Sequence, residues 1–166
     1  MAAAALGCDA VVAISRTSGK KEDAFKMGAT DFIATDEDSK WNRKHAGSLD
    51  IIISTVSGPQ MPIRRYLQLL RFNGTFVQVG APEDPIPGFN AYALISKRVK
   101  ITGSQIGSPQ EIKDMLKFFA EKGVKTWNNN VPMREANQAI VDMEAGKARY
   151  RYVLVNEKHN KERPKL

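Results

Sequence analysis

A basic, hydroxyl-rich turn near the N-terminus has the residue types best suited to binding an anion. The apolar stretch Ala10–Ile14 leads directly into this turn, which contains Ser15, Arg16, Thr17 and Lys20. A guanidinium, two hydroxyls and an ammonium bind a phosphate through charge-assisted hydrogen bonds. A solvated basic loop is the alternative, because Lys and Arg commonly occupy surface turns.

The place of this turn in the chain indicates which phosphate it would bind. In a dinucleotide-binding fold the second strand ends beside the adenosine ribose, where an acidic residue hydrogen-bonds the free 2′-hydroxyl of NAD. Here Ser15, Arg16 and Thr17 occupy that place. A carboxylate would repel a 2′-phosphate, whereas this turn would attract one. The turn therefore predicts NADP rather than NAD as the cofactor.

Length and composition restrict the class of protein. At 166 residues the chain is long enough for one well-buried domain, or for a domain with part of a second. No apolar run approaches the roughly 18 residues of a membrane-spanning helix. The apolar start Met1–Leu6 lacks the basic segment of a secretory signal. We therefore expect no membrane span and a cytoplasmic protein.

Cysteine and histidine usage argues against a metal site. The single cysteine, Cys8, excludes an intramolecular disulfide and a multi-cysteine zinc site built by this chain alone. We expect Cys8 to be a small core residue. His45 and His159 lie in polar stretches without a ligand partner at metal spacing.

The formal net charge of +7 would suit an anionic partner such as a nucleic acid. The basic residues do not form one block, however, and nothing in the sequence resembles an aromatic-and-basic platform for nucleic acid. Several lie in the polar tail 158–166, which we expect to be disordered. They are Lys158, Lys161, Arg163 and Lys165. We predict no nucleic-acid partner.

Strand and helix signals alternate along the chain, which predicts an α/β fold with a parallel sheet. The run Asp50–Val56 is apolar and β-branched, typical of a strand buried on both faces, and the polar stretch Asp36–Ser48 reads as a connection. The other expected strands are Ala10–Ile14, Asp31–Thr35, Thr75–Val79 and Val99–Thr102. The expected helices are Met1–Leu6, Lys20–Met27, Met61–Phe72, Tyr92–Ser96 and one capped by Ser108 and Glu111.

A last unit follows the expected helix that starts at Ser108. It consists of an extended piece Lys125–Val131, a helix Arg134–Ala145 and a strand Arg149–Val155. The expected organisation is a partial dinucleotide-binding domain over residues 1–124, a C-terminal segment over 125–157 and the polar tail.

Five ordered segments carry a resemblance to a known family. They are SRTSGKKEDAFKMGATDFIAT, DIIISTVS, FVQVGAPE, ITGSQIGSPQEI and ARYRYVLV. In this order and spacing they resemble the zinc-type medium-chain alcohol dehydrogenases, and within them the NADP-dependent branch similar to cinnamyl alcohol dehydrogenases. The resemblance covers nearly all of residues 5–157. It implies a Rossmann-like doubly wound sheet, with residues 125–157 returning toward a catalytic domain.

The resemblance also implies contacts for individual residues. Ser15, Arg16 and Lys20 match the family's contacts to the 2′-phosphate, in agreement with the electrostatic argument. The other matched positions are Ser54, Thr55 and Val56 beside the adenosine and ribose; Val79, Gly80 and Ala81 along the nicotinamide ribose; Ser104, Gln105 and Ile106 at the carboxamide; and Arg151 at the pyrophosphate.

Each of these positions also has a local explanation. Ser54 and Thr55 can satisfy backbone groups at a strand end. Gly80 can serve a turn without a ligand. Arg151 alternates with tyrosines on an expected strand and can face solvent.

Parts of the family pattern have no counterpart in this sequence. The glycine-rich loop and the first strand, which is central in the sheet, would precede Met1, and the zinc ligands of the family are not present. Loss of that strand would leave two unpaired edges in the core. We therefore expect a truncated NADP-dependent alcohol dehydrogenase that binds cofactor without catalysing hydride transfer to an alcohol or aldehyde alone.

Two other readings stay open. A stand-alone NADP-binding or regulatory module would show one-to-one NADPH binding by the isolated chain, and a nucleic-acid-binding protein would show salt-sensitive DNA binding that NADPH does not displace. The family is usually dimeric through the strand corresponding to Val99–Thr102, so the resemblance also implies a homodimer.

Overall fold

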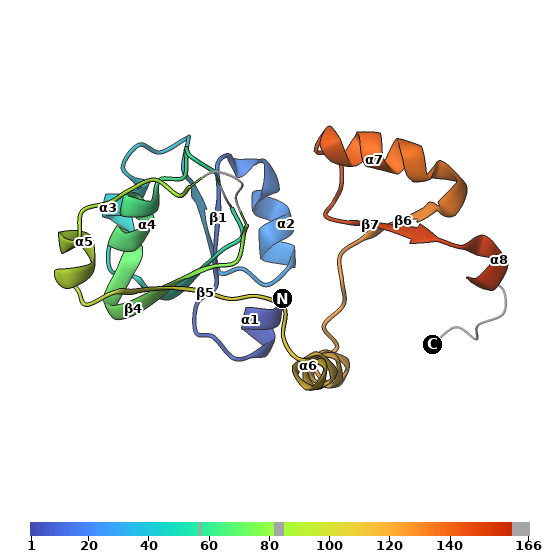
Figure 1. Cartoon of the computed structure of the whole chain (residues 1–166), viewed down its shortest axis with the longest axis horizontal. Coiled ribbons are helices and arrows are strands. Elements are labelled where there is room, and N and C mark those ends of the chain that lie inside the picture. The colour runs from blue at the N-terminus through green and yellow to red at the C-terminus, as the bar shows by residue number, and fades with distance from the viewer. Residues whose placement is uncertain (57, 82–84, 161–166) are drawn as a thin grey trace. The chain divides into compact units, whose positions relative to one another are not determined.

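The computed structural model describes residues 1–56, 58–81 and 85–160 (Figure 1). It contains two compact units: Met1–Phe118, and a second that begins at Phe119. Short helices alternate with parallel strands through the first unit, which confirms the predicted α/β class.

The strands of the first unit form two separate parallel sheets. In one, β1 (Val12–Ser15) pairs with β2 (Asp31–Ala34). In the other, β3 (Leu49–Ser54), β4 (Leu70–Gln78) and β5 (Lys100–Gly103) lie in the order β3-β4-β5. Within each sheet the carboxyl ends of the strands share one edge, where loops can form a ligand site.

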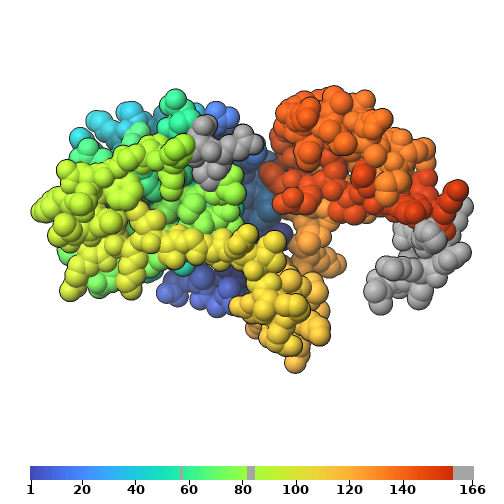
Figure 2. Space-filling model, viewed as in Figure 1, coloured from blue at the N-terminus to red at the C-terminus, as the bar shows by residue number. Residues whose placement is uncertain are grey.

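Short helices connect these strands. α4 contacts both α3 and α5, and the three helices lie together in Figure 1. In the space-filling view of Figure 2, the yellow-green segment after residue 85, which includes α5, covers much of the visible face of the first unit. The helical segments are α1 (Ala2–Ala5), η1 (Ser18–Lys20), α2 (Lys21–Lys26), α3 (Trp41–Lys44), α4 (Ile63–Leu69), α5 (Tyr92–Ile95) and α6 (Pro109–Glu121).

Several predicted helix ends are confirmed. Gly7 and Gly28 follow α1 and α2 with φ of 81° and 93°, a conformation that a residue without a Cβ adopts at little cost. At the start of α6 the Ser108 N–H donates to Glu111 Oε2 at 2.6 Å, and the Glu111 N–H donates to Ser108 Oγ at 3.3 Å. This is the predicted capping box.

The interpretation of Asp36–Ser48 as a polar connection was incomplete. It contains α3, and Trp41 in this helix is only 1% exposed. The Trp41 ring lies 5.4 Å from the Tyr66 ring, and the Arg65 guanidinium lies over the indole at 4.5 Å. Burial of the large Trp41 side chain thus packs an otherwise polar segment against the core, because the apolar area that the indole buries is large.

The expectation that β3 is buried on both faces was wrong. Ile52 and Ser54 are each 7% exposed, whereas Ile51 and Ile53 are 55% and 64% exposed. Side chains alternate across a strand, so these two pairs lie on opposite faces of the sheet. One face of β3 packs into the core while the other is open.

The segment Met61–Phe72 does not stay helical up to Asn73–Gly74 as expected. The helix α4 ends at Leu69, and Leu70 already has extended backbone with φ −67° and ψ 141°. Both leucines are fully buried, so packing takes precedence over the local turn signal. Asn73–Gly74 instead lies within β4, where the register against β3 shifts.

An open cavity of about 300 Å³ separates the two sheets of the first unit. The lining includes Val12 and Ile14 of β1 together with Ile51 and Ile53 of β3. In the part of the chain that the structure describes, β1 pairs only with β2, and β3 pairs only with β4. Each of these two strands therefore has one unpaired edge, as expected. Cys8 also lines this cavity but is exposed, so its assignment to the core was wrong.

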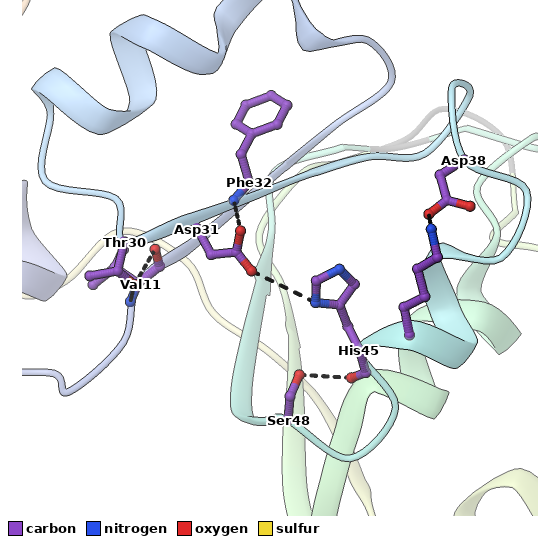
Figure 3. A network of polar contacts seen from close by, with 8 residues as sticks. Val11, Thr30, Asp31, Phe32, Asp38, His45 and Ser48 are labelled. Atoms are coloured by element: carbon purple, nitrogen blue, oxygen red, sulfur yellow. Dashed lines mark hydrogen bonds and ion pairs between the residues drawn. The ribbon is translucent and has the colours of Figure 1, made fainter.

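A polar network fixes the first sheet to its surroundings (Figure 3). Thr30 Oγ1 accepts a hydrogen bond from the Val11 N–H at 2.9 Å and donates to the Val11 carbonyl at 3.2 Å. His45 Nδ1, after α3, lies 3.8 Å from Asp31 Oδ2 at the start of β2. The Thr30 contacts hold the beginnings of β1 and β2 together, and the His45–Asp31 contact joins β2 to the segment after α3.

The second unit is a small parallel ribbon with a helix. β6 (Asn129–Pro132) pairs with β7 (Tyr152–Val155), and α7 (Ala136–Glu144) contacts both strands after η2 (Met133–Glu135). Part of the expected disordered tail is structured, because α8 covers Glu157–Asn160 and the Arg134 guanidinium pairs with the Glu157 carboxylate at 2.5 Å. Residues 161–166 of that expected tail lie outside the described residues.

Candidate functional site

The basic turn follows β1 and is held by the segment after β2. The Thr35 N–H donates to the Ser15 carbonyl and the Asp36 N–H to the Arg16 carbonyl, each at 2.9 Å. Ser15 is half-buried, whereas Arg16 and Thr17 are exposed. The backbone of the turn is thus fixed while its side chains face outward.

Donor groups of the turn remain available for a ligand. Among the residues that the structure describes, no partner engages the Arg16 guanidinium or the hydroxyls of Ser15 and Thr17. Lys20 ends η1 on the same turn. One guanidinium and two hydroxyls without partners are the donor set that a phosphate needs.

The sequence analysis missed an acidic residue at this turn. Glu37 Oε1 accepts hydrogen bonds from both the Ser18 N–H, at 2.8 Å, and the Ser18 hydroxyl, at 3.1 Å. The parallel register pairs Ser15 with Ala34, so the residues after each strand lie opposite one another. An explicit pairing of the two predicted strands would have brought Glu37 to the turn.

A second cluster joins the ends of β3 and β4. The N–H groups of Val79 and Gly80 both donate to the Ser54 carbonyl, at 2.8 and 3.0 Å. A Cβ on Gly80 would lie 2.6 Å from the Thr55 carbonyl oxygen and 3.1 Å from that of Val56. Gly80 therefore allows the two strand ends to approach one another closely, without reference to a ligand.

Gln78 links the same two loops through its side chain. Its Nε2 donates to the Val56 carbonyl at 2.9 Å and to the Gly80 carbonyl at 2.7 Å. The Ser54 hydroxyl donates to the Val56 carbonyl at 3.1 Å, so Ser54 has the local backbone role that its position allows. Sequence reasoning missed Gln78, although a polar residue in an otherwise apolar strand is a usable signal.

Of the remaining predicted residues, Ser104 contacts this cluster, whereas Arg151 belongs to the second unit. The Ser104 N–H donates to the Gln78 carbonyl at 3.1 Å, which joins the end of β5 to that of β4. Gln105 and Ile106 extend beyond it, and Ile106 is 86% exposed. Ala81 is exposed, and Arg151 is an exposed residue of the second unit.

The cavity between the sheets reaches the β3 end of the cluster. Ser54, Thr55 and Val56 line it together with Ile14, the residue before Ser15 in β1. Tyr66 also lines it, and burial raises the pKa of the Tyr66 phenol, which keeps the hydroxyl neutral at physiological pH. The cavity is therefore an uncharged, mainly apolar space between the two predicted groups of site residues.

Two negative findings apply to the described ranges 1–56, 58–81 and 85–160. No group of three or more His, Cys, Asp or Glu side chains is arranged to hold a metal ion. No helix in these ranges is long and apolar enough to cross a membrane.

Comparison with known sequences decides the family. A family model described as "Zinc-binding dehydrogenase" matches residues 1–121. The chain belongs to the zinc-binding dehydrogenase family. This confirms the resemblance to the family: the match includes four of the five segments and both clusters of the first unit.

Individual relatives agree with this assignment. The chain is 36% identical over 155 residues to NADP-dependent alcohol dehydrogenase 6 of Saccharomyces cerevisiae, a match covering 91% of this chain and 42% of the relative. A solved cinnamyl alcohol dehydrogenase from Sorghum bicolor is 36% identical with a TM-score of 0.80, covering 87% of this chain and 40% of that one.

A second solved structure is described with a bound cofactor. The structure described as "CAD from Helicobacter pylori complexed with NADP(H)" is 28% identical with a TM-score of 0.72, covering 87% of this chain and 40% of that one. These likenesses confirm the predicted Rossmann-like fold class. The chain thus spans about two fifths of the length of these relatives.

Proposed function

We propose that this chain binds NADP(H) and that the turn after β1 holds the 2′-phosphate. The observation that carries the proposal is the Arg16 guanidinium, exposed beside the hydroxyls of Ser15 and Thr17 with no partner among the described residues. Lys20 adds a second cation to the same turn. The relatives named as NADP-dependent support the choice of NADP over NAD.

The second cluster is proposed to lie along the rest of the cofactor. Hydrogen bonds join the ends of β3, β4 and β5, so the residues at these ends form one contiguous edge. We assign residues 54–56 to the adenosine and its ribose, residues 79–81 to the nicotinamide ribose, and residues 104–106 to the carboxamide. Arg151 is proposed as a pyrophosphate contact.

The reaction of the whole protein is proposed to be reversible hydride transfer between NADP(H) and an alcohol or aldehyde. Bound cofactor would supply or accept the hydride, and the residues of this chain would hold and select it. The described residues do not form a zinc site, so no step is assigned to a metal here. On this proposal residues 1–124 are part of a cofactor domain, residues 125–157 belong with the catalytic domain, and the chain alone does not catalyse.

The proposal also includes an oligomeric state and a cellular location. β5 pairs with β4 as the outer strand of its sheet, and a second copy could pair there to give a homodimer. We also propose that the protein is cytoplasmic; among the described residues no helix is long and apolar enough to cross a membrane.

A calorimetric titration of the whole chain with NADPH and, in parallel, NADH tests the proposal. We expect saturable binding with a preference for NADPH that Arg16→Ala reduces about 10- to 100-fold, as expected for loss of one charge-assisted phosphate contact. Arg64→Ala is the matched control, because Arg64 is an exposed arginine that belongs to α4 and not to the basic turn. Equal affinity for the two cofactors, or equal effects of both substitutions, would refute the assignment.

A further inference from the structure

Glu37 places a fixed negative charge on the turn proposed to bind the 2′-phosphate. One carboxylate oxygen accepts hydrogen bonds from two donors of the same residue, the Ser18 N–H at 2.8 Å and the Ser18 hydroxyl at 3.1 Å. Hydrogen bonds to a charged acceptor are shorter and stronger than neutral ones. The Glu37 side chain is therefore held on the turn although it is exposed.

This contact removes donors from the turn as well as adding charge. A phosphate at Arg16 and Thr17 would find the next residue, Ser18, already bound to a carboxylate. A phosphate bound at Arg16 and Thr17 and the Glu37 carboxylate bound at Ser18 would repel each other. Both groups are negative, and the residues that bind them are adjacent in the turn. The neighbouring carboxylate, Asp36 Oδ1, accepts a hydrogen bond from the Thr35 hydroxyl at 3.2 Å.

We propose that Glu37 determines how strongly the turn discriminates in favour of a 2′-phosphate. Its carboxylate anchors the segment after β2 to the turn, and its charge weakens phosphate binding relative to a neutral acceptor in the same place. This inference rests on the proposed function, because it concerns the same turn. It adds a selectivity residue that lies outside the basic segment itself.

Glu37→Gln separates the two effects of this residue. The glutamine Oε1 still accepts hydrogen bonds from the Ser18 N–H and hydroxyl, so the anchor is retained while the charge is removed. The probes are adenosine 2′,5′-bisphosphate and adenosine 5′-monophosphate, which differ only by the 2′-phosphate. Glu144→Gln is the charge-matched control, because Glu144 is an exposed residue of α7 in the second unit.

Calorimetry on the whole chain gives the affinity of each variant for each probe. We expect Glu37→Gln to bind the bisphosphate about three- to ten-fold more tightly, the range expected for removal of one exposed like charge. Binding of the monophosphate should be unchanged, and Glu144→Gln should match the original chain. Thermal unfolding of each variant checks that the fold is retained.

The outcomes distinguish this inference from the proposed function. If the original chain prefers the bisphosphate and Glu37→Gln leaves both affinities unchanged or weakens them, Glu37 has no selectivity role and only this inference fails. If neither protein binds either probe, both proposals fail. Binding of the bisphosphate by Glu37→Gln alone would support Glu37 as the group that opposes the phosphate.

Discussion

Replacing Gly80 by alanine places a methyl group against the backbone of the neighbouring strand end. The new Cβ would lie 2.6 Å from the Thr55 carbonyl oxygen, whereas ordinary contact begins at 3.4 Å, so the loop after β3 must retreat by about 0.8 Å. The Ser54 carbonyl at the end of β3 accepts hydrogen bonds from Val79 and Gly80, and the Val56 carbonyl in the loop accepts one from Gln78. The clash therefore acts on the junction that joins β3 to β4.

The cost follows from overpacking against a backbone that other bonds hold in place. Such insertions destabilise a protein by about 1–3 kcal/mol. For a chain of this size that corresponds to a fall in the melting temperature of roughly 3–10 °C. Calorimetric thermal unfolding of the Gly80→Ala protein measures this fall, and a parallel NADPH titration should show weaker binding because the displaced residues 54–56 are part of the proposed site.

Gly88→Ala is the matched control for this prediction. A Cβ on Gly88 meets no atom within 4 Å, and Gly88 does not have the positive φ that side chains avoid. This variant should melt at or slightly above the temperature of the original chain, because alanine restricts the unfolded state. If the Gly80→Ala and Gly88→Ala proteins have the same melting temperature, Gly80 is not needed for the close approach of the β3 and β4 ends, and the reasoning is refuted.

Three further predictions concern the core, the helix cap and the open strand face. Trp41→Ala should lower the free energy of unfolding by about 3–5 kcal/mol in a urea titration, since the indole is almost wholly buried; a loss below 1 kcal/mol would contradict its core role. The Ser108 N–H holds the pKa of the Glu111 carboxyl below its usual range, so the contribution of this cap to α6 is present at neutral pH and is lost as pH falls through that lowered pKa. Protection of the α6 amides, measured against the intrinsic exchange rate at each pH, should fall as pH drops through that pKa in the original chain, and a Glu111→Gln protein should not show this change. Replacing both Ile51 and Ile53 by threonine should reduce self-association measured by light scattering, with little change in melting temperature, because both side chains are exposed on β3. Unchanged scattering would show that this face of β3 does not mediate self-association.

Local patterns predicted most of the elements, because their signals agree with the packing. The glycines after α1 and α2 and the capping box at Ser108 act within one or two turns of chain, and each is where the sequence puts it. The β-branched run predicted β3 for the same reason. What local patterns could not predict is which face of that strand is covered, because that depends on segments distant in the sequence.

The errors have the same physical origin. Trp41 joins the core through Tyr66 and Arg65, and Cys8 is exposed because the space beside it is open. Leu69 and Leu70 override the turn signal that follows them. In each case a tertiary contact, or the lack of one, decides the outcome.

Part of the candidate site could likewise be predicted from local sequence, and part depends on tertiary contacts. The charge and hydroxyl pattern of residues 15–20 is a local property, so the sequence alone pointed to a phosphate. Glu37 and Gln78 reach the predicted residues through parallel strand pairing, and neither carries a local signal of comparable strength. Residue roles along the cofactor stay predictions until binding is measured.

Hydrogen exchange measured by mass spectrometry, on the whole chain with saturating NADPH or NADH, tests the central claim most directly. Our account predicts that NADPH slows exchange in the peptide covering β1, the basic turn and α2 more than NADH does, and that Arg16→Ala removes this difference. Equal protection of that peptide by the two cofactors, or protection confined to other segments, would contradict the assignment of the 2′-phosphate to this turn.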